Sequence, residues 1–211
     1  KLIDIAKVAG CDIVKFQKRN PDICVPEHQK TVMRDTPWGR MSYLDYKYKV
    51  EFGQNEYDEI NIYCKERNIH WSASPWDLDS LDFLNQYDIP FIKIPSALIT
   101  NLELLKATAE TGKKIIISTG MSTIEDVDNA VNAIKSKNPD VDFALLHCNS
   151  SYPAPNKDLN LRCIQTLKEK YNCEVGYSGH EFGLTTTIAS VCLGATIIER
   201  HITIDRTMWG T

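Results

Sequence analysis

Short apolar and β-branched runs recur along the chain and predict the strands of a sheet. Each run is three to six residues long, which suits a buried strand better than a helix. The runs cover residues 12–16, 69–73, 91–94, 115–118, 142–147, 174–177 and 196–198. We therefore expect seven strands.

Amphipathic stretches with the sequence signals of helix ends separate most of these runs. Residues 2–9 have helical spacing, and Gly10 follows them as a stop signal. Thr100-x-x-Glu103 and Ser122-x-x-Glu125 have the spacing of capping boxes, and Gly112 ends the first of these two helices. The predicted order is strand then helix, repeated.

This alternation predicts a parallel α/β sheet, either closed as a (β/α)8 TIM barrel or open and doubly wound. Seven strands after an opening helix fit a barrel whose first strand would precede Lys1. The open sheet remains the alternative, although no G-x-G-x-x-G motif or P-loop stands at a strand-to-helix turn. We expect residues 1–211 to form one barrel domain that lacks its first strand.

One connection is much longer than the others. Residues 18–52 contain several prolines, the string Thr36-Pro-Trp-Gly39 and a tyrosine-rich run, before a predicted helix at 55–67. An insertion of this length on a barrel is either a functional loop or lid, or a surface excursion that contacts another subunit. The sequence leaves both alternatives open.

Composition excludes several classes of protein. With 43% hydrophobic and 25% charged residues the chain has the make-up of a globular domain. A formal charge of -4 and a pI near 5.8, with no basic stripe, argue against nucleic acid as a partner. The seven cysteines are scattered without a C-x-x-C pair, which suits a reducing cytosol. No apolar run approaches the roughly 20 residues of a membrane span, and we expect a cytoplasmic protein.

Polar residues follow the predicted strands, at the end of a (β/α) barrel where active sites lie. Lys15 and Lys93 fall within strand-like runs, where a lysine is unusual unless its charge is paired or meets a ligand. Hydroxyl groups stand at four further strand ends, on Ser74, Ser96, Ser118 and Ser178. Converging lysines and hydroxyls predict a pocket for an anion such as phosphate.

Two histidines end neighbouring predicted strands. His180 and His201 can approach one point across that edge, and a histidine pair with a nearby carboxylate can bind a divalent metal. Glu199 alternates with His201 and is expected on the same side. His147 is a third candidate, although its position suits a supporting hydrogen bond equally well. Glu199 is expected either to orient a ligand or accept a proton, or to form a salt bridge with Arg200 or another cation.

The strings at these strand ends resemble the N-acetylneuraminate (sialic acid) synthase family, in order along nearly the whole chain. They are Lys15-Phe-Gln17, Ser72-Ala-Ser-Pro-Trp-Asp77, Ile92-Lys-Ile-Pro-Ser96, Ile117-Ser-Thr-Gly-Met-Ser122, Leu146-His-Cys-Asn-Ser-Ser-Tyr-Pro153, Gly176-Tyr-Ser-Gly-His180 and Ile198-Glu-Arg-His-Ile202. Thr36-Pro-Trp-Gly39 and the closing Asp205-Arg-x-Met-Trp-Gly210 belong to the same pattern.

The resemblance implies a (β/α)8 barrel followed by a small antifreeze-like domain, assembled as a homodimer in which that domain reaches the partner's active site. Neither the first strand, with its glutamate, nor the small domain, with an arginine that touches the sugar, is expected within these 211 residues. The implied reaction condenses phosphoenolpyruvate, an N-acylated amino sugar and water to a sialic acid and phosphate.

The resemblance also implies roles for individual residues. Those holding the phosphate and carboxylate of phosphoenolpyruvate would be Lys15, Lys93, Ser96, Ser118 and Ser178, with Ser74 where the family often has threonine. Gln17 and Tyr152 would meet the amino sugar. His180 and His201 would ligate manganese or magnesium. Catalytic roles are expected for Lys15, Lys93 and Glu199.

Three alternatives remain. A legionaminate or pseudaminate synthase would use the same fold and chemistry on a 6-deoxy diacetamido sugar. A Schiff-base aldolase would form a covalent adduct on Lys93 and need no metal. A non-catalytic sugar-phosphate binding module would bind ligand without releasing phosphate.

Overall fold

The computed structural model describes residues 1–208, so the Trp209-Gly210 end of the closing motif lies outside the described residues. The chain separates into two compact units, Lys1–Pro90 with the segment from Ile202 onward, and Phe91–His201. Each unit has its own strands, helices and buried residues.

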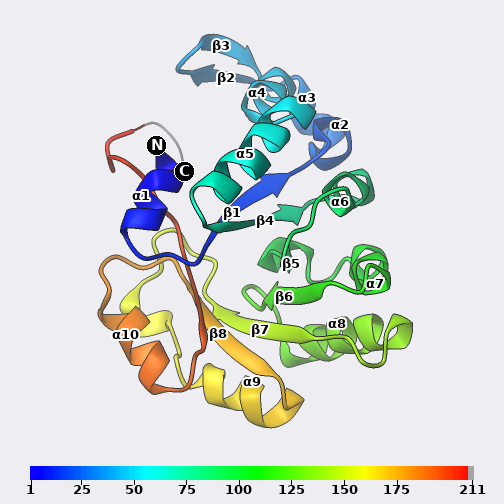
Figure 1. Cartoon of the computed structure of the whole chain (residues 1–211), viewed down its shortest axis with the longest axis vertical. Coiled ribbons are helices and arrows are strands. Elements are labelled where there is room, and N and C mark those ends of the chain that lie inside the picture. Colours follow the sequence, from blue (N-terminus) through cyan, green and yellow to red (C-terminus); the bar gives the residue numbers. More distant parts are fainter. Residues whose placement is uncertain (209–211) are drawn as a thin grey trace. The chain divides into compact units, whose positions relative to one another are not determined.

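The first unit contains a parallel strand pair and a separate hairpin. Its elements are α1 (Leu2–Val8), β1 (Ile13–Lys18), α2 (Pro21–Cys24), α3 (Glu27–Lys30), β2 (Met33–Thr36), β3 (Gly39–Ser42), α4 (Tyr43–Val50), α5 (Gln54–Glu66), β4 (His70–Pro75) and α6 (Leu78–Asn85). β1 pairs with β4 in parallel, whereas β2 and β3 form an antiparallel hairpin beside α4 (Figure 1).

A buried tyrosine organises this unit. Tyr57 on α5 is 0% exposed, and its ring centroid lies 6.4 Å from that of Phe16, 5.6 Å from Trp71 and 5.2 Å from Phe83. Aromatic rings at such separations contribute packing energy beyond the area they bury. The Tyr57 hydroxyl donates to the Gln17 carbonyl at 2.7 Å, and this bond fixes the carboxyl end of β1.

The second unit alternates five strands with four α-helices. Its elements are β5 (Phe91–Ile94), η1 (Ser96–Leu98), α7 (Leu102–Glu110), β6 (Lys114–Ser118), α8 (Ile124–Lys137), β7 (Phe143–Cys148), η2 (Asn156–Asp158), α9 (Cys163–Tyr171), β8 (Glu174–Gly179), α10 (Thr185–Cys192) and β9 (Ile197–Arg200). Each strand pairs in parallel with the next along the chain. Figure 1 shows α7, α8 and α9 on one side of these curved strands.

The two faces of the second unit's strands differ in chemistry. Because side chains alternate along a strand, Ile92, Ile94, Ile115 and Ile117 share one face, where all four are fully buried. The other face begins with an apolar layer made of Ile116, Ala144 and Leu146, with Phe91 and Ile197 packed against it. Polar side chains continue this second face toward the carboxyl ends of the strands.

The structure confirms all seven predicted strands, with boundaries that differ by at most two residues. It also confirms the opening helix and its stop, since Gly10 has a φ of 82°, which glycine adopts without steric cost. The long connection contains three short helices and the hairpin of β2 and β3, which the apolar pattern did not predict. In the described residues, no helix is long and apolar enough to cross a membrane.

Both predicted capping boxes were wrong by one residue. The helix expected to begin at Thr100 is capped by Asn101, whose side chain accepts from the Leu104 amide. The next helix is capped by Thr123 rather than Ser122, and its reciprocal partner is Asp126. An aspartate three residues after the cap replaces the glutamate of the usual motif.

Candidate active site

Strand register collects the predicted residues of the second unit on one face. Ser118 pairs with Leu146, Cys148 with Ser178, and Ser178 with Glu199 in successive strand pairs. Residues two apart on a strand point the same way. From strand to strand, this face therefore carries Lys93, Ser118, Cys148, Ser178 and Glu199. They lie at its carboxyl end, beyond the apolar layer.

Lys93 is 2% exposed and fully engaged with neighbouring atoms. Its ammonium donates to Ser118 Oγ at 2.7 Å and to the Ile94 carbonyl at 3.2 Å. It also lies 3.6 Å from Glu199 Oε1. In the structure the partner of this charge is a carboxylate of the protein, and an anionic ligand for Lys93 stays a prediction.

Glu199 completes a chain of polar contacts. The Ser178 hydroxyl donates to Glu199 Oε1 at 2.7 Å. The same carboxylate oxygen therefore accepts this hydrogen bond and lies beside the Lys93 ammonium. The salt-bridge alternative for Glu199 is therefore present, with Lys93 rather than Arg200 as the cation. The Glu199 side chain is 23% exposed.

The predicted histidine pair is assembled together with Tyr152. The ring centroids of His180 and His201 are 5.4 Å apart. The Tyr152 ring lies 4.0 Å from that of His180 and 5.8 Å from that of His201. All three predicted residues thus meet at the carboxyl ends of β7, β8 and β9.

The two ring nitrogens of His180 have different partners. Nδ1 donates to the Asn149 carbonyl at 2.7 Å, which leaves Nε2 as the nitrogen with a lone pair. Nε2 lies 2.9 Å from the Tyr152 hydroxyl, which donates to it. A backbone carbonyl that holds Nδ1–H is the usual way in which proteins orient a metal-binding histidine.

Cys148 belongs to this site, although the strand pattern alone did not single it out. Its sulfur lies 3.8 Å from Nδ1 of His180. Burial raises the pKa of the Cys148 thiol, but hydrogen bonds with His180 and Ser96 outweigh burial, and the pKa is lowered. Burial lowers the pKa of His180, but the contacts with Cys148 and the Asn149 carbonyl outweigh it, and the pKa is raised.

Gly120 allows the β6 end to approach this cluster closely. A Cβ at Gly120 would lie 2.3 Å from Ser150 Oγ, 2.8 Å from Ser96 Oγ and 3.2 Å from Cys148 Sγ. The Gly120 amide donates to Ser96 Oγ at 3.0 Å. Ser96 is thereby held next to Cys148, as its place in the predicted anion pocket requires.

His147 does not join the histidine pair. It is adjacent to Cys148, so its side chain points to the opposite face, where its ring lies 6.1 Å from that of Tyr177. Its Nε2 bonds to the Leu159 carbonyl, and burial lowers its pKa. His147 supports the β7 loop instead of providing a metal ligand.

Three predicted residues lie in the first unit. Lys15 pairs in register with Ser72 and Gln17 with Ser74, so these four side chains share one face of β1 and β4. Lys15 and Gln17 are exposed, whereas Ser74 is 0% exposed and its hydroxyl has no hydrogen-bond partner. The Gln17 side chain accepts from Arg19. The first unit thus presents a lysine, an amide and an unpaired hydroxyl on one face.

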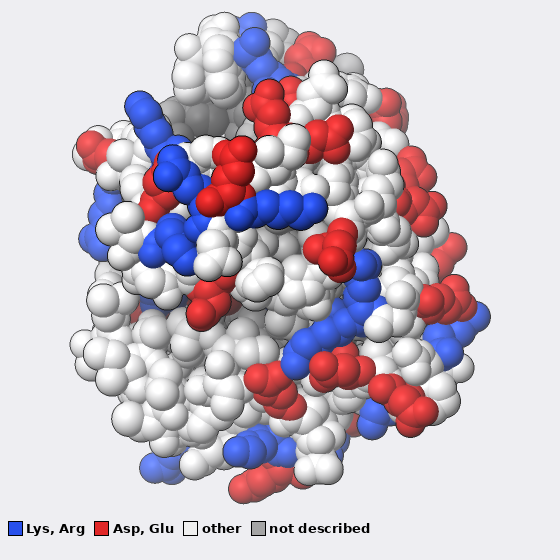
Figure 2. Space-filling model, in the orientation of Figure 1, with Lys and Arg blue, Asp and Glu red and all other residues white. Residues whose placement is uncertain are grey.

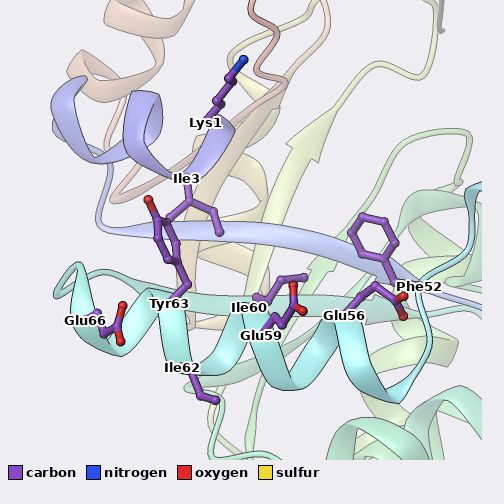
Figure 3. A pocket seen from close by; sticks show the side chains of 9 residues that line it. All are labelled: Lys1, Ile3, Phe52, Glu56, Glu59, Ile60, Ile62, Tyr63 and Glu66. Carbon is purple, nitrogen blue, oxygen red and sulfur yellow. The ribbon is translucent and has the colours of Figure 1, made fainter.

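A cavity of about 440 Å³ lies elsewhere in the first unit, between α1 and α5 (Figure 3). Ile3 and Tyr63 lie next to each other there, and Glu56, Glu59 and Glu66 also line it. None of the predicted site residues contributes to this cavity. On the face drawn in Figure 2, acidic and basic side chains are interspersed and neither sign covers a broad area.

The histidine pair fits a metal with an open coordination sphere. Among the described residues, no group of three histidine, cysteine or acidic side chains is arranged to hold a metal ion. The oriented Nε2 of His180 and the adjacent His201 ring would be two nitrogen donors to such a metal, and water or substrate would have to complete the shell. Two nitrogen donors suit manganese better than calcium.

Comparison with known proteins identifies the family. The model of the NeuB family matches residues 2–211. The chain belongs to the NeuB family. Over 218 residues it is 38% identical to the N,N'-diacetyllegionaminic acid synthase of Campylobacter jejuni, covering 100% of this chain and 64% of that protein. Over 214 residues it is 39% identical to the N-acetylneuraminate-9-phosphate synthase of Drosophila melanogaster, covering 100% of this chain and 57% of that protein.

A solved structure confirms the fold class of this NeuB-family chain. The crystal structure of N-acetylneuraminic acid synthetase from Leptospira borgpetersenii, in complex with citrate, matches it with a TM-score of 0.87 at 35% identity. The match covers 98% of this chain and 67% of that chain. The predicted barrel-type α/β fold of the sialic acid synthases is therefore correct. The chain spans 57 to 64% of the two relatives' lengths.

Proposed function

We propose that the protein condenses phosphoenolpyruvate with an N-acylated amino sugar and water, and releases a nonulosonic acid and phosphate. Family membership supports this chemistry, because the relatives include sialic and legionaminic acid synthases. The observation that carries the proposal is the buried Lys93, in contact with Ser118 and close to Glu199 on the face that also bears Ser178.

An anion can bind there by exchanging partners with Glu199. The phosphate or carboxylate of phosphoenolpyruvate would take the place of the Glu199 oxygen beside Lys93, with Ser118, Ser178 and Ser96 as further donors. Family resemblance gives Lys15 on β1 and Ser74 on β4 the same ligand. A charged donor paired with an anion forms a short, strong hydrogen bond, and fixing the phosphate also orients the enol carbon for reaction.

A divalent metal, manganese or magnesium, would be held by His180 and His201 and would act as a Lewis acid toward the sugar's aldehyde oxygen. The chain's own residues would orient that ligand set. The Asn149 carbonyl holds His180 in the required tautomer. The Tyr152 hydroxyl would leave Nε2 and contact the amino sugar, a role that family resemblance also gives to Gln17.

The proposed reaction forms one carbon–carbon bond and one carbon–oxygen bond to water, and it breaks the carbon–oxygen bond to phosphate. The terminal enol carbon of phosphoenolpyruvate attacks the aldehyde carbon, and positive charge develops on the former enol carbon. Water adds there and gives a tetrahedral phosphate hemiketal. Glu199, released from Lys93, would accept one proton of that water and pass it to the alkoxide oxygen formed from the aldehyde. The other water proton goes to phosphate, which leaves with its bridging oxygen and yields the 2-keto acid.

The sugar is N-acetylmannosamine or a close relative in this proposal. A 6-deoxy diacetamido sugar is the second candidate, because a legionaminic acid synthase is 38% identical. Product analysis of the full-length protein, given phosphoenolpyruvate with each sugar in turn, tests both. A nonulosonic acid from one of them supports the proposal, whereas turnover with neither contradicts it.

The Schiff-base alternative fits the geometry less well. A Schiff base needs an accessible amine, but Lys93 is 2% exposed and lies against a carboxylate. Borohydride treatment in the presence of substrate provides the test. A trapped adduct on Lys93 would support an aldolase, and no adduct is expected.

We further propose that the full-length protein is a cytoplasmic homodimer whose antifreeze-like domain completes the partner's site. Family resemblance supports this assembly. Sedimentation of the full-length protein at several concentrations tests it, with a dimer mass as the expected result.

A further inference from the structure

An ion pair whose carboxylate is fully buried lies beside the histidine pair. Glu181 follows His180, and Arg200 precedes His201, so each member of the ion pair is the chain neighbour of one histidine. The alternation that turns the histidines to the site face turns Glu181 and Arg200 to the opposite face. There they contact one another and the first turn of α10.

Arg200 ties the end of β9 to the loop after β8. Its Nη1 donates to Glu181 Oε1 and, at 2.9 Å, to Thr187 Oγ1. Its Nη2 donates to the carbonyls of Glu181 at 2.8 Å and Gly183 at 3.2 Å. A planar guanidinium can make several such bonds in fixed directions, which a lysine ammonium cannot reproduce.

Glu181 is held from three sides. Its side chain has 0% exposure, and the hydroxyls of Tyr177 and Thr186 donate to it in addition to Arg200. A buried carboxylate with this many partners is fixed in position, because breaking the set would leave an uncompensated charge in the interior. The backbone on both sides of Glu181 is fixed with it.

Gly179 provides the space for this arrangement. A Cβ at Gly179 would lie 2.7 Å from Arg200 Nη1 and 2.9 Å from Glu181 Oε2. Any side chain there would displace the ion pair. The ion pair of Glu181 and Arg200 therefore depends on a glycine at position 179.

We propose that Glu181 and Arg200 are positioning residues that set the separation and orientation of His180 and His201. This inference rests on the proposed metal site. Without the pair, the β8 loop and the β9 end would move independently, and the two rings would have to be brought together when the metal binds. The pair itself touches neither the metal nor the substrate in this proposal.

The test compares manganese binding in full-length variants, with the free metal followed by electron paramagnetic resonance. Arg200→Met is expected to weaken manganese binding about 10- to 100-fold, the range typical of residues that orient metal ligands. Arg200→Lys keeps the charge but loses the planar set of donors, and should fall between the parent and Arg200→Met. Phosphoenolpyruvate affinity measured without metal is expected to change less than manganese affinity, since Arg200→Met removes none of the proposed anion-binding side chains.

Lys114→Met is the matched control. Lys114 forms an ion pair with Glu174 at 2.5 Å at the amino ends of β6 and β8 and is 28% exposed, close to the 25% of Arg200. Its loss should lower the melting temperature without changing manganese affinity. Equal weakening in Lys114→Met and Arg200→Met would assign the effect to general stability and overturn the proposal.

His180→Ala in the same titration separates this inference from the proposed function. Loss of manganese binding in His180→Ala, with parental binding in folded Arg200→Met and Arg200→Lys, would overturn the positioning role alone. Parental binding in His180→Ala would overturn both. Should Arg200→Met fail to fold, Arg200→Lys and Thr187→Val, which removes one contact to the guanidinium, provide the same comparison.

Discussion

The ammonium of Lys93 on β5 lies 3.6 Å from a carboxylate oxygen of Glu199 on β9, although three strands separate β5 from β9 in the second unit. Neighbouring strands are about 4.8 Å apart, so a flat sheet would place these two strands roughly 19 Å apart. The contact requires strong curvature with both side chains on the concave face. It also places the proposed phosphate-binding lysine and the proposed proton acceptor in direct contact.

Lys93→Ala in the full-length protein should weaken phosphoenolpyruvate binding about 10- to 100-fold, because a charge-assisted contact is worth about 1.5 to 3 kcal/mol. Amino-sugar binding should change much less. The substitution also removes the ammonium that pairs with the Glu199 carboxylate, so the melting temperature should fall. Titration calorimetry and a melting curve check the two effects separately.

The double variant Lys93→Ala/Glu199→Gln is the control for stability. It removes both charges, so much of the lost stability should return while phosphoenolpyruvate affinity stays low. An unchanged phosphoenolpyruvate dissociation constant in the folded single variant would show that Lys93 is only a structural ion-pair partner.

Chelation should abolish most of the activity of the full-length enzyme, and manganese should restore it. His180→Ala and His201→Ala should lose metal-dependent activity while the fold is kept, because both residues lie at strand ends beyond the core. His147→Gln is the matched control, since His147 faces the other side of β7. It should keep manganese affinity even where stability falls. Full turnover in excess chelator would show that the reaction needs no metal.

Tyr152→Phe removes the hydroxyl that bonds to Nε2 of His180 at 2.9 Å and keeps the ring that stacks on it. Since the metal and this hydroxyl need the same nitrogen, the variant should bind manganese at least as tightly as the parent. The KM for the amino sugar should rise several-fold if Tyr152 contacts the sugar. A weakened manganese affinity would instead make Tyr152 a metal ligand or its support.

Thr123→Ala should lower the free energy of unfolding by about 1 kcal/mol, because it removes the cap of α8 and the partner of Asp126. The neighbouring Ser122→Ala should cost less than about 0.5 kcal/mol, as Ser122 donates to the Gly120 carbonyl and does not cap the helix. Urea unfolding of both variants compares them directly. A larger loss in Ser122→Ala would place the helix start one residue earlier.

Much of the fold was predictable, because buried parallel strands leave continuous apolar runs such as Ile115–Ile117 between polar ends. The hairpin of β2 and β3 was not, since Met33–Thr36 and Gly39–Ser42 are mostly exposed and lack an apolar alternation. The capping signals were found one residue away from the true caps. Serine and threonine stand side by side at 122 and 123, and composition alone does not choose between them.

The candidate site was predictable where strand ends carry polar residues. The predicted strand-end residues of the second unit lie together: Lys93, Ser118, Ser178 and Glu199. The ion pair between Lys93 and Glu199 depends on sheet curvature, which local sequence does not encode. Cys148 was missed because cysteine belongs to the apolar pattern of its strand. Glu181 and Arg200 were missed because each looked like a polar residue beside a histidine, and their contact joins positions 19 residues apart.

The most direct test of the proposed reaction uses phosphoenolpyruvate labelled with ¹⁸O in the bridging position, full-length protein, manganese and the candidate amino sugars. Mass spectrometry then follows the label. Carbon–oxygen cleavage at the Lys93 site predicts that all the released phosphate carries the label and that it appears in step with a nonulosonic acid. Unlabelled phosphate, or no phosphate release with any of the sugars, would contradict the account.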